Sequence, residues 1–345
     1  MNPFALLITS ISLIAGTTTT FLSHHWLLAW IGLEINTLAI IPLMTKTPHP
    51  RAIEAATKYF LTQATASAMI LFSSTLNAWF TGEWAITNLS HPIATLTLTI
   101  ALSMKLGLAP FHFWLPEVLQ GLNLTTGLIL STWQKLAPMA LLLQLSSSLN
   151  LEVMMLIGII STILGGWGGI NQTQLRKVLA FSSIAHLGWM ITVMNFAPHL
   201  ALFNLFIYII MTSTMFITFI SLSSKKMTDL STSWPKAPAL TTLTMLVLLS
   251  LGGLPPLSGF MPKWFIAQEL INHNLIMFTS IILISTLLSL FFYLRLTYIM
   301  ALTLAPNSTL STLTWRNHNK TLTATLIILA LSLIPLAPTL LALMP

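Results

Sequence analysis

The sequence has 345 residues, of which 55% are apolar and 6% charged, and its mean hydropathy is +0.85. A soluble domain contains roughly 25% charged residues, so these values exclude an ordinary water-soluble enzyme. The chain contains no cysteine, which excludes disulfides, iron–sulfur ligation by cysteine and thiolate chemistry. Its net charge of +7 comes from basic residues that form no cluster, so it does not indicate a nucleic-acid partner.

Apolar stretches recur along the whole chain and predict membrane-spanning segments. At about 20 residues per crossing, the length allows about eleven. No basic region or cleavage site precedes the first stretch, so we expect a permanent span there and no signal peptide. Lipid permits only helices or closed barrels, and the stretches show no two-residue alternation. We therefore predict helical spans at 3–20, 25–44, 54–79, 92–121, 125–146, 151–171, 175–194, 198–222, 239–271, 277–301 and 322–343.

The basic residues of the loops, counted together with those near the ends of the adjoining spans, fall on one side of the predicted membrane. Consecutive spans alternate in direction, so the even-numbered loops lie on the side of the N-terminus. The odd-numbered loops contain Glu83 and Glu152 and no basic residue. By the positive-inside rule, the N-terminus faces the side of synthesis, and an odd number of spans places the C-terminus opposite. The basic residues of the even-numbered loops are Lys46, Arg51, Lys58, Arg176, Lys177, Lys225, Lys226, Lys236, Arg316 and Lys320.

The fourth and ninth predicted spans (92–121 and 239–271) are too long for one crossing and are interrupted by Pro and Gly. At an offset of 146 residues, their Gly, Leu and two Pro positions coincide, and Trp114 matches Phe260. Four and nine differ by an odd number, so a duplicated five-helix unit must be inverted relative to its first copy. Such repeats are typical of ion-coupled transporters, with the ion site at the break; two unrelated proline kinks are the alternative. The break residues are Gly107, Pro110, Gly253, Pro256 and Pro262.

The predicted fold class is an all-α polytopic membrane protein with about 11 transmembrane helices. The first five-helix repeat occupies 1–146 and contains the broken helix at 92–121. The second, inverted repeat occupies 151–301 and contains the broken helix at 239–271. An additional C-terminal transmembrane helix follows at 322–343.

The other four basic residues lie deeper inside predicted spans, where a charge costs about 2.5–3.5 kcal/mol on insertion scales and usually marks an ion or proton pathway. They are Lys105, Lys135, Lys263 and Arg295. Glu34 lies near the middle of the second span and needs a partner there. Lys105 is the nearest basic candidate in the same repeat; the alternative is a neutral carboxylic acid hydrogen-bonded to Asn36 or to a neighbouring helix. Arg295 cannot lose its proton, which favours a structural or electrostatic role over that of a carrier.

The two lysines near the breaks occupy different ends of their half-helices. Lys105 lies two residues before Gly107, where unwound carbonyls and the negative end of the helix dipole would stabilise an ammonium. Lys263 lies at the start of a second half-helix, where the positive end of the dipole would make its proton easy to release. In the gap-free alignment Lys263 matches Glu117 and not Lys105, so the repeats are similar but not equivalent.

Two further titratable residues lie at mid-span. Lys135 is central in the fifth span, too deep for its ammonium to reach either interface easily. His186 is central in the seventh span and shares a helix face with Ser182 and Ser183. Its titration range suits proton transfer, although a hydrogen-bonded core histidine is equally compatible with this position. We expect no metal site, because no group of His, Asp and Glu stands at ligand spacing.

Several motifs resemble the mitochondrially encoded, antiporter-like membrane subunits of respiratory complex I. They read GLEIN at 32–36, PRAIEAATKYF at 50–60, KLGLAPFHFW at 105–114 and GFMPKW at 259–264, and the resemblance covers the whole chain. It implies two inverted five-helix repeats, with the first three of the family's usual fourteen helices missing. It also implies a proton path through Glu34, Lys105, Lys135, His186 and Lys263. His112, in the first break, and Arg295 are secondary candidates.

The resemblance implies coupling of electron transfer from NADH to ubiquinone in other subunits to proton pumping across the mitochondrial inner membrane. NADH, FMN, iron–sulfur clusters and ubiquinone would act elsewhere in the complex, and we expect no cofactor, catalytic residue or metal in this chain. The expected partners are chain 4, chain 4L, accessory subunits and membrane lipids. The N-terminus would face the matrix and the C-terminus the intermembrane space. A free-standing cation/proton antiporter and a structural membrane spacer are the alternatives.

Overall fold

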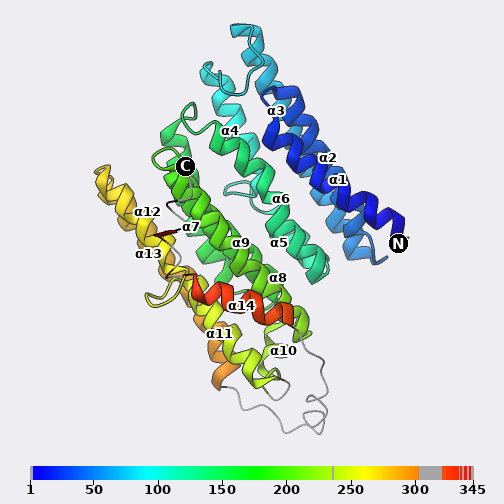
Figure 1. The fold of residues 1–345 in the computed structure, drawn as a ribbon, viewed down its shortest axis with the longest axis vertical. Coiled ribbons are helices and arrows are strands. Elements are labelled where there is room, and N and C mark those ends of the chain that lie inside the picture. The colour runs from blue at the N-terminus through cyan, green and yellow to red at the C-terminus, as the bar shows by residue number, and fades with distance from the viewer. Residues whose placement is uncertain are drawn as a thin grey trace. The chain divides into compact units, whose positions relative to one another are not determined.

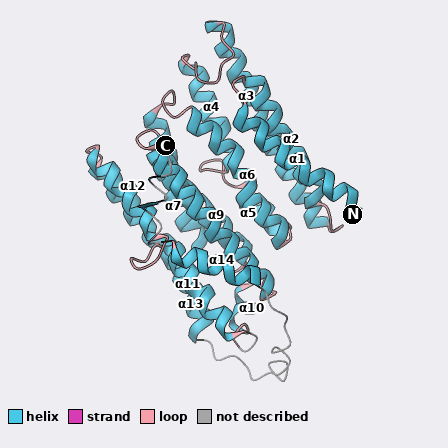
Figure 2. Ribbon diagram, viewed as in Figure 1, coloured by secondary structure: helices cyan, strands magenta, loops and turns pink. Residues whose placement is uncertain are grey.

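The computed structural model describes residues 3–234, 237–302 and 321–333, together with residues 335, 338, 339 and 342. Within these residues every regular element is a helix, as Figure 2 shows, which confirms the predicted all-helical class. Three of the basic loop residues used to predict orientation, Lys236, Arg316 and Lys320, lie outside the described residues, as does part of the predicted span at 322–343.

The chain divides into two compact units, Met1–Ser161 and Thr162–Pro345. This division falls inside one helix, whereas the sequence repeats are predicted to meet between 146 and 151. In the first unit, α1 packs on α2, α2 packs on α3, and α6 contacts α1, α2 and α4 (Figure 1). Its helices are α1 (Pro3–Leu22), α2 (Trp26–Met44), α3 (Pro50–Thr81), α4 (Pro92–Leu106), α5 (Trp114–Gly121), α6 (Leu124–Gln144) and the first part of α7 (Leu151–Ile170).

The second unit repeats one packing relationship of the first. In the first unit, α3 contacts both α4 and α5; in the second, α9 contacts both α11 and α12. The short helix α10 lies in a loop for which the sequence predicted no element. The helices of the second unit after α7 are α8 (Leu175–Met194), α9 (Pro198–Ser221), α10 (Met227–Ser231), α11 (Pro238–Gly252), α12 (Phe260–Asn272), α13 (Ile276–Leu302) and α14 (Thr321–Ser332).

Each of the two long predicted spans is a pair of helices separated by a seven-residue break (107–113 and 253–259). Helices α4 and α11 both begin at a proline, which tolerates the first turn because the N–H it lacks there has no intrahelical partner. From Pro92 to Pro238, from Leu106 to Gly252, and from Trp114 to Phe260 the difference is 146 residues each time. The two breaks therefore share their boundaries as well as their sequence pattern.

A glycine in the left-handed region ends the first half of each broken helix. Gly107 has φ 77° and Gly253 has φ 85°, values at which a Cβ atom adds strain. Pro110 and Pro256 lie within the breaks, as expected. Pro262 does not: it is the third residue of α12, in the first turn, where a proline removes no helical hydrogen bond.

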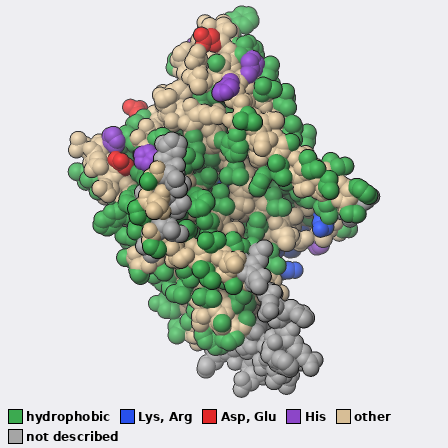
Figure 3. All heavy atoms as spheres, in the orientation of Figure 1, with side chains coloured by type: hydrophobic (Ala, Val, Ile, Leu, Met, Phe, Trp, Pro, Cys, Tyr) green, Lys and Arg blue, Asp and Glu red, His purple; other side chains and the backbone are tan. Residues whose placement is uncertain are grey.

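The exterior and the helix lengths are those of a multi-pass membrane protein. Six described helices, α1, α2, α7, α8, α9 and α13, are long and apolar enough to cross a membrane. Many large apolar side chains are exposed; those of Trp79 and Leu22, for example, are 85% and 79% exposed. Figure 3 shows apolar side chains spread over the face that it draws, with few charged groups among them. A soluble monomer rarely exposes apolar surface on this scale.

The glycines of α7 contact two different neighbours. A Cβ on Gly165 would lie 2.6 Å from the backbone nitrogen of Ala185 in α8, whereas one on Gly169 would lie 2.7 Å from the ring of Phe292 in α13. The two glycines stand at GxxxG spacing, which is typical of close helix contacts, and here they allow close approach of two separate helices.

Candidate functional site

Glu34 lies in α2, half-buried, and its carboxylate accepts two hydrogen bonds from hydroxyl groups. Thr37 Oγ1 donates to Oε2 at 2.7 Å, and Ser67 Oγ, from α3, donates to Oε1 at 3.0 Å. Within the described residues Glu34 forms no ion pair, although its carboxylate lies within electrostatic range of the Lys105 ammonium. The partners that satisfy Glu34 in this state are therefore hydroxyl groups and not the expected lysine.

Lys105 and Lys135 line one cavity in the first unit. Their side chains come from α4 and α6 and are 5% and 4% exposed. The volume open to the centre of a water molecule is about 20 Å³, and one water needs about 10–15 Å³ on this measure, so the cavity can hold a water. The other polar side chains that line it are Asn36, Thr37, Tyr59, Gln63 and Gln134.

The ammonium of Lys105 is not stabilised by the carbonyls of the break. Lys105 Nζ is buried and has no hydrogen-bond partner among the described residues, and the carbonyl oxygen of Lys105 accepts from Gln63 Nε2 at 3.4 Å. The sequence-based expectation for this residue is wrong for a geometric reason. Helical side chains point toward the N-terminus of their helix, so a lysine in the last turn of α4 points away from the carbonyls at its end.

Lys263 has the carbonyl contacts that Lys105 lacks. Its Nζ donates to the carbonyl oxygens of Gly252 at 3.0 Å and Leu251 at 3.4 Å, at the C-terminal end of α11. The same rule of side-chain direction explains this, since Lys263 is in the first turn of α12 and points back across the break. Lys263 therefore lies in the first turn of α12, as predicted, and its ammonium also meets the negative end of α11, which the sequence does not show.

His186 and Lys263 line a second cavity, which lies within the second unit. It is bounded by α8, α12 and α13, and its volume open to the centre of a water molecule is about 10 Å³, close to what one water needs. The imidazole of His186 packs against the ring of Tyr208, with their centres 5.6 Å apart. The hydroxyls of Ser182 and Ser183 donate to carbonyls of their own helix at 2.8 and 2.7 Å.

The secondary candidates have structural contacts. Arg295 Nη1 donates to the carbonyl oxygen of Ile170, the last residue of α7, at 2.7 Å, which is a typical way to satisfy a helix C-terminus. This contact supports the structural role that the sequence favours. His112 is buried in the first break, next to the ring of Phe113 at 4.3 Å between centres.

The predicted residues thus gather in two groups, each inside one unit. Lys105 and Lys135 line one cavity, with the Glu34 carboxylate within electrostatic range of Lys105, and His186 and Lys263 line the other. Sequence reasoning missed Thr37 and Ser67. Thr37 is one helical turn after Glu34 and could have been found from that spacing, whereas Ser67 is on another helix and has no local signal. The described residues contain no group of three or more His, Asp or Glu that could hold a metal.

A family model described as the membrane domain of the NADH:quinone oxidoreductase/Mrp antiporters matches residues 23–289, and one for the C-terminus of NADH dehydrogenase subunit 2 matches residues 290–341. The fold and these matches define the class, an antiporter-like membrane protein. The NADH-ubiquinone oxidoreductase chains 2 of Xenopus laevis and Salmo salar are each 61% identical over 341 residues, covering 98% of this chain and 99% and 98% of theirs. The chain belongs to the NADH-ubiquinone oxidoreductase chain 2 family, which confirms the resemblance.

Solved structures share the fold. A chain of respiratory complex I from Thermus thermophilus with bound aureothin is 27% identical, with a TM-score of 0.86 over 99% of this chain and 80% of that one. A chain of the Mrp complex from Dietzia sp. is 17% identical, with a TM-score of 0.82 over 97% of this chain and 76% of that one. The second similarity shows the fold alone.

Proposed function

We propose that this chain is a proton-translocating subunit of the membrane arm of respiratory complex I. The observation that carries the proposal is the cavity shared by the buried Lys105 and Lys135, with the Glu34 carboxylate within electrostatic range of Lys105. Ionisable groups at membrane depth are expensive and typically mark proton pathways. Family membership supports the complex in which this path would work, since the relatives are named as NADH-ubiquinone oxidoreductase chain 2.

In the first unit, Glu34 and Lys105 act as the charge-sensitive pair. A change of charge in a neighbouring subunit alters the attraction between the Glu34 carboxylate and the Lys105 ammonium, and thereby the readiness of Lys105 to release its proton. Lys105 then passes a proton through water in the cavity toward Lys135. The unpartnered ammonium of Lys105 supports this role, because no protein hydrogen bond has to break before the proton moves.

In the second unit, His186 and Lys263 continue the path. Both line one cavity, and Lys263 exchanges a proton with the far side of the membrane. Its ammonium donates to the carbonyl oxygens of Leu251 and Gly252, and these hydrogen bonds hold it beside the break. Lys105, in contrast, faces the first cavity without a hydrogen-bond partner for its ammonium among the described residues.

The arrangement in the membrane belongs to the same proposal. We propose eleven crossings in two inverted five-helix repeats, 1–146 and 151–301, and location in the mitochondrial inner membrane. The positive-inside pattern supports a matrix N-terminus and an intermembrane-space C-terminus. The matching boundaries of the two broken helices support the duplication.

The chain works as one part of a translocase, NADH:ubiquinone reductase. NADH, FMN, iron–sulfur clusters and ubiquinone act in other subunits, and this chain contributes no redox centre. The partners proposed are chain 4, chain 4L and accessory subunits, together with membrane lipids. Similarity to a chain of complex I from Thermus thermophilus supports other membrane-arm subunits as neighbours.

Native electrophoresis of mildly solubilised membranes tests the proposal. The gel is stained for NADH oxidation and probed for this chain. Co-migration with a large NADH-oxidising band is the expected result. A small separate band without that activity would contradict it and favour a free-standing cation/proton antiporter, which would exchange ions in liposomes without redox partners.

A further inference from the structure

One face of α3 contacts the broken helix of the first unit at four successive levels. A Cβ on Gly121 would lie 2.6 Å from the carbonyl oxygen of Arg51. Farther along α3, Lys58 Nζ lies 2.6 Å from Glu117 Oε2, the ring of Tyr59 packs edge-on against Trp114, and Gln63 Nε2 donates to the carbonyl oxygen of Lys105. Arg51 and Lys58 are two turns apart and Tyr59 and Gln63 one turn apart, so each pair shares a helix face, and the two pairs run side by side along α3.

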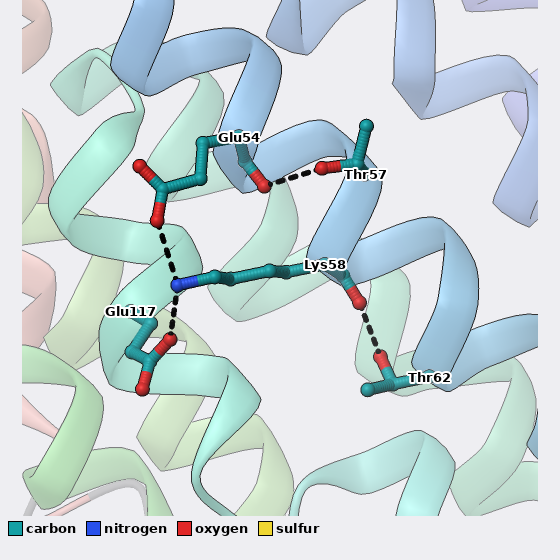
Figure 4. Close-up of polar contacts among 5 residues, drawn as sticks. All are labelled: Glu54, Thr57, Lys58, Thr62 and Glu117. Atoms are coloured by element: carbon teal, nitrogen blue, oxygen red, sulfur yellow. Dashed lines mark hydrogen bonds and ion pairs between the residues drawn. The ribbon is translucent and has the colours of Figure 1, made fainter.

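The ion pair is an exposed contact in this set. Figure 4 shows the Lys58 ammonium between two carboxylates, that of Glu54 on its own helix and that of Glu117 on α5. The Lys58 side chain is 42% exposed and that of Glu117 50% exposed. The Glu54 contact, at 2.8 Å, joins residues four apart within α3. Only the Glu117 contact ties one helix to another.

Helix α5 is held by its buried residues Trp114, Leu115, Pro116, Val118 and Leu119 and, on its exposed face, by the Lys58 pair. It has eight residues, and isolated helices shorter than about 12 residues are marginal even in favourable sequences. A seven-residue break separates it from α4. Its residues Trp114 and Leu115 form part of the wall of the cavity that Lys105 and Lys135 line, so a shift of α5 changes that cavity.

We propose that Lys58 is a positioning residue for proton transfer: its ion pair with Glu117 holds α5, and with it Trp114 and Leu115, closed over the Lys105 cavity. When the pair is lost, α5 moves and the cavity opens toward the end of the unit where Lys58 lies. A proton on Lys105 then has a second way out. This inference rests on the proposed function, since it assigns a closure to the same cavity.

The test uses variants of this chain in the assembled complex and measures protons translocated per NADH oxidised. We expect Glu117→Gln and Lys58→Met each to lower the number of protons translocated per NADH oxidised. The value should fall to that of the Lys135→Ala complex, while NADH oxidation continues. Lys58→Arg keeps the pair and should keep the wild-type ratio. Glu54→Gln is the matched control: it removes a carboxylate from the same ammonium but leaves the contact with α5, so the ratio should not change.

A charge swap separates the pair from a general effect on assembly. Lys58→Glu with Glu117→Lys should restore the wild-type ratio; it is made together with Glu54→Gln, because like charges four residues apart on a helix repel. A wild-type ratio in Glu117→Gln, equal damage from Glu54→Gln, or a swap that fails to restore coupling would overturn the inference. A wild-type ratio in Lys135→Ala would instead contradict the proposed function itself. Should Glu117→Gln fail to assemble, Lys58→Met and the swap decide the question.

Discussion

Lys263 Nζ lies 3.0 Å from the carbonyl oxygen of Gly252, so that a lysine at the start of α12 binds the end of α11 across the break between them. Lys105, near the first break, makes no such contact within the described residues. At the second break, the Lys263 ammonium lies against the carbonyls of a helix end. At the first break, Lys105 instead lines a cavity. The two lysines therefore have different contacts although the broken helices share their boundaries.

The first prediction concerns Gly253, the left-handed residue beside Lys263. A Cβ at this position would lie 2.8 Å from Lys263 Nζ, so Gly253→Ala displaces the ammonium from its carbonyl partners. The backbone strain costs about 1–2 kcal/mol, which lowers the temperature of thermal inactivation. We expect the ratio of protons to electrons to fall as well.

Gly82→Ala is the control for this variant. Gly82 has φ 75° at the end of α3, and a Cβ there meets nothing within 4 Å. It should show a similar loss of thermal stability with a normal ratio of protons to electrons. Equal coupling defects in both glycine variants would show that strain, and not the position of Lys263, is responsible.

The second prediction concerns the charge of Glu34. Glu34→Gln keeps the size of the side chain and an oxygen that accepts from a hydroxyl, but it removes the negative charge that Lys105 senses. We expect an assembled complex with fewer protons translocated per NADH oxidised. Ser67→Ala removes one hydrogen bond, at 3.0 Å, and leaves the carboxylate; its effect on the ratio should be smaller. A larger effect of Ser67→Ala than of Glu34→Gln would contradict the prediction that the charge of Glu34 is what matters.

The third prediction separates a structural cation from the carriers. Arg295→Met removes the donor to the carbonyl oxygen of Ile170, and hydrogen bonds to charged groups contribute about 1.5–3 kcal/mol. We expect earlier thermal inactivation and an unchanged ratio of protons to electrons in the complex that remains. A lowered ratio at full assembly would place Arg295 in the proton path.

Much of the fold follows from sequence because membrane helices depend on local properties. Apolar length, prolines and glycines placed the breaks of α4–α5 and α11–α12 within a few residues. The orientation of side chains at those breaks was harder to predict, since a sequence position does not show which way a lysine points relative to a helix end. The contacts of the Lys105 and Lys263 ammonium groups could not be predicted for this reason. Ser67 could not be predicted either, because it reaches Glu34 from another helix.

The charge pattern of the sequence also does not predict ion pairs between distant residues. Lys58 and Glu117 are 59 residues apart in the sequence, and counting them as loop and span charges gave no sign that they pair. Their contact depends on how α5 continues along α3 after the break. Pairings of this kind follow from tertiary packing, whereas Glu54 and Lys58, four apart on one helix, follow from spacing alone.

The most direct test of the account is the ratio of protons translocated to NADH oxidised in an assembled complex that contains Lys135→Ala. Lys135 is 4% exposed and lines the same cavity as Lys105, so its loss removes the acceptor proposed for the Lys105 proton. We predict nearly intact assembly with lower proton translocation and slower coupled NADH oxidation. An unchanged ratio in a fully assembled complex would contradict the proton path proposed for this chain.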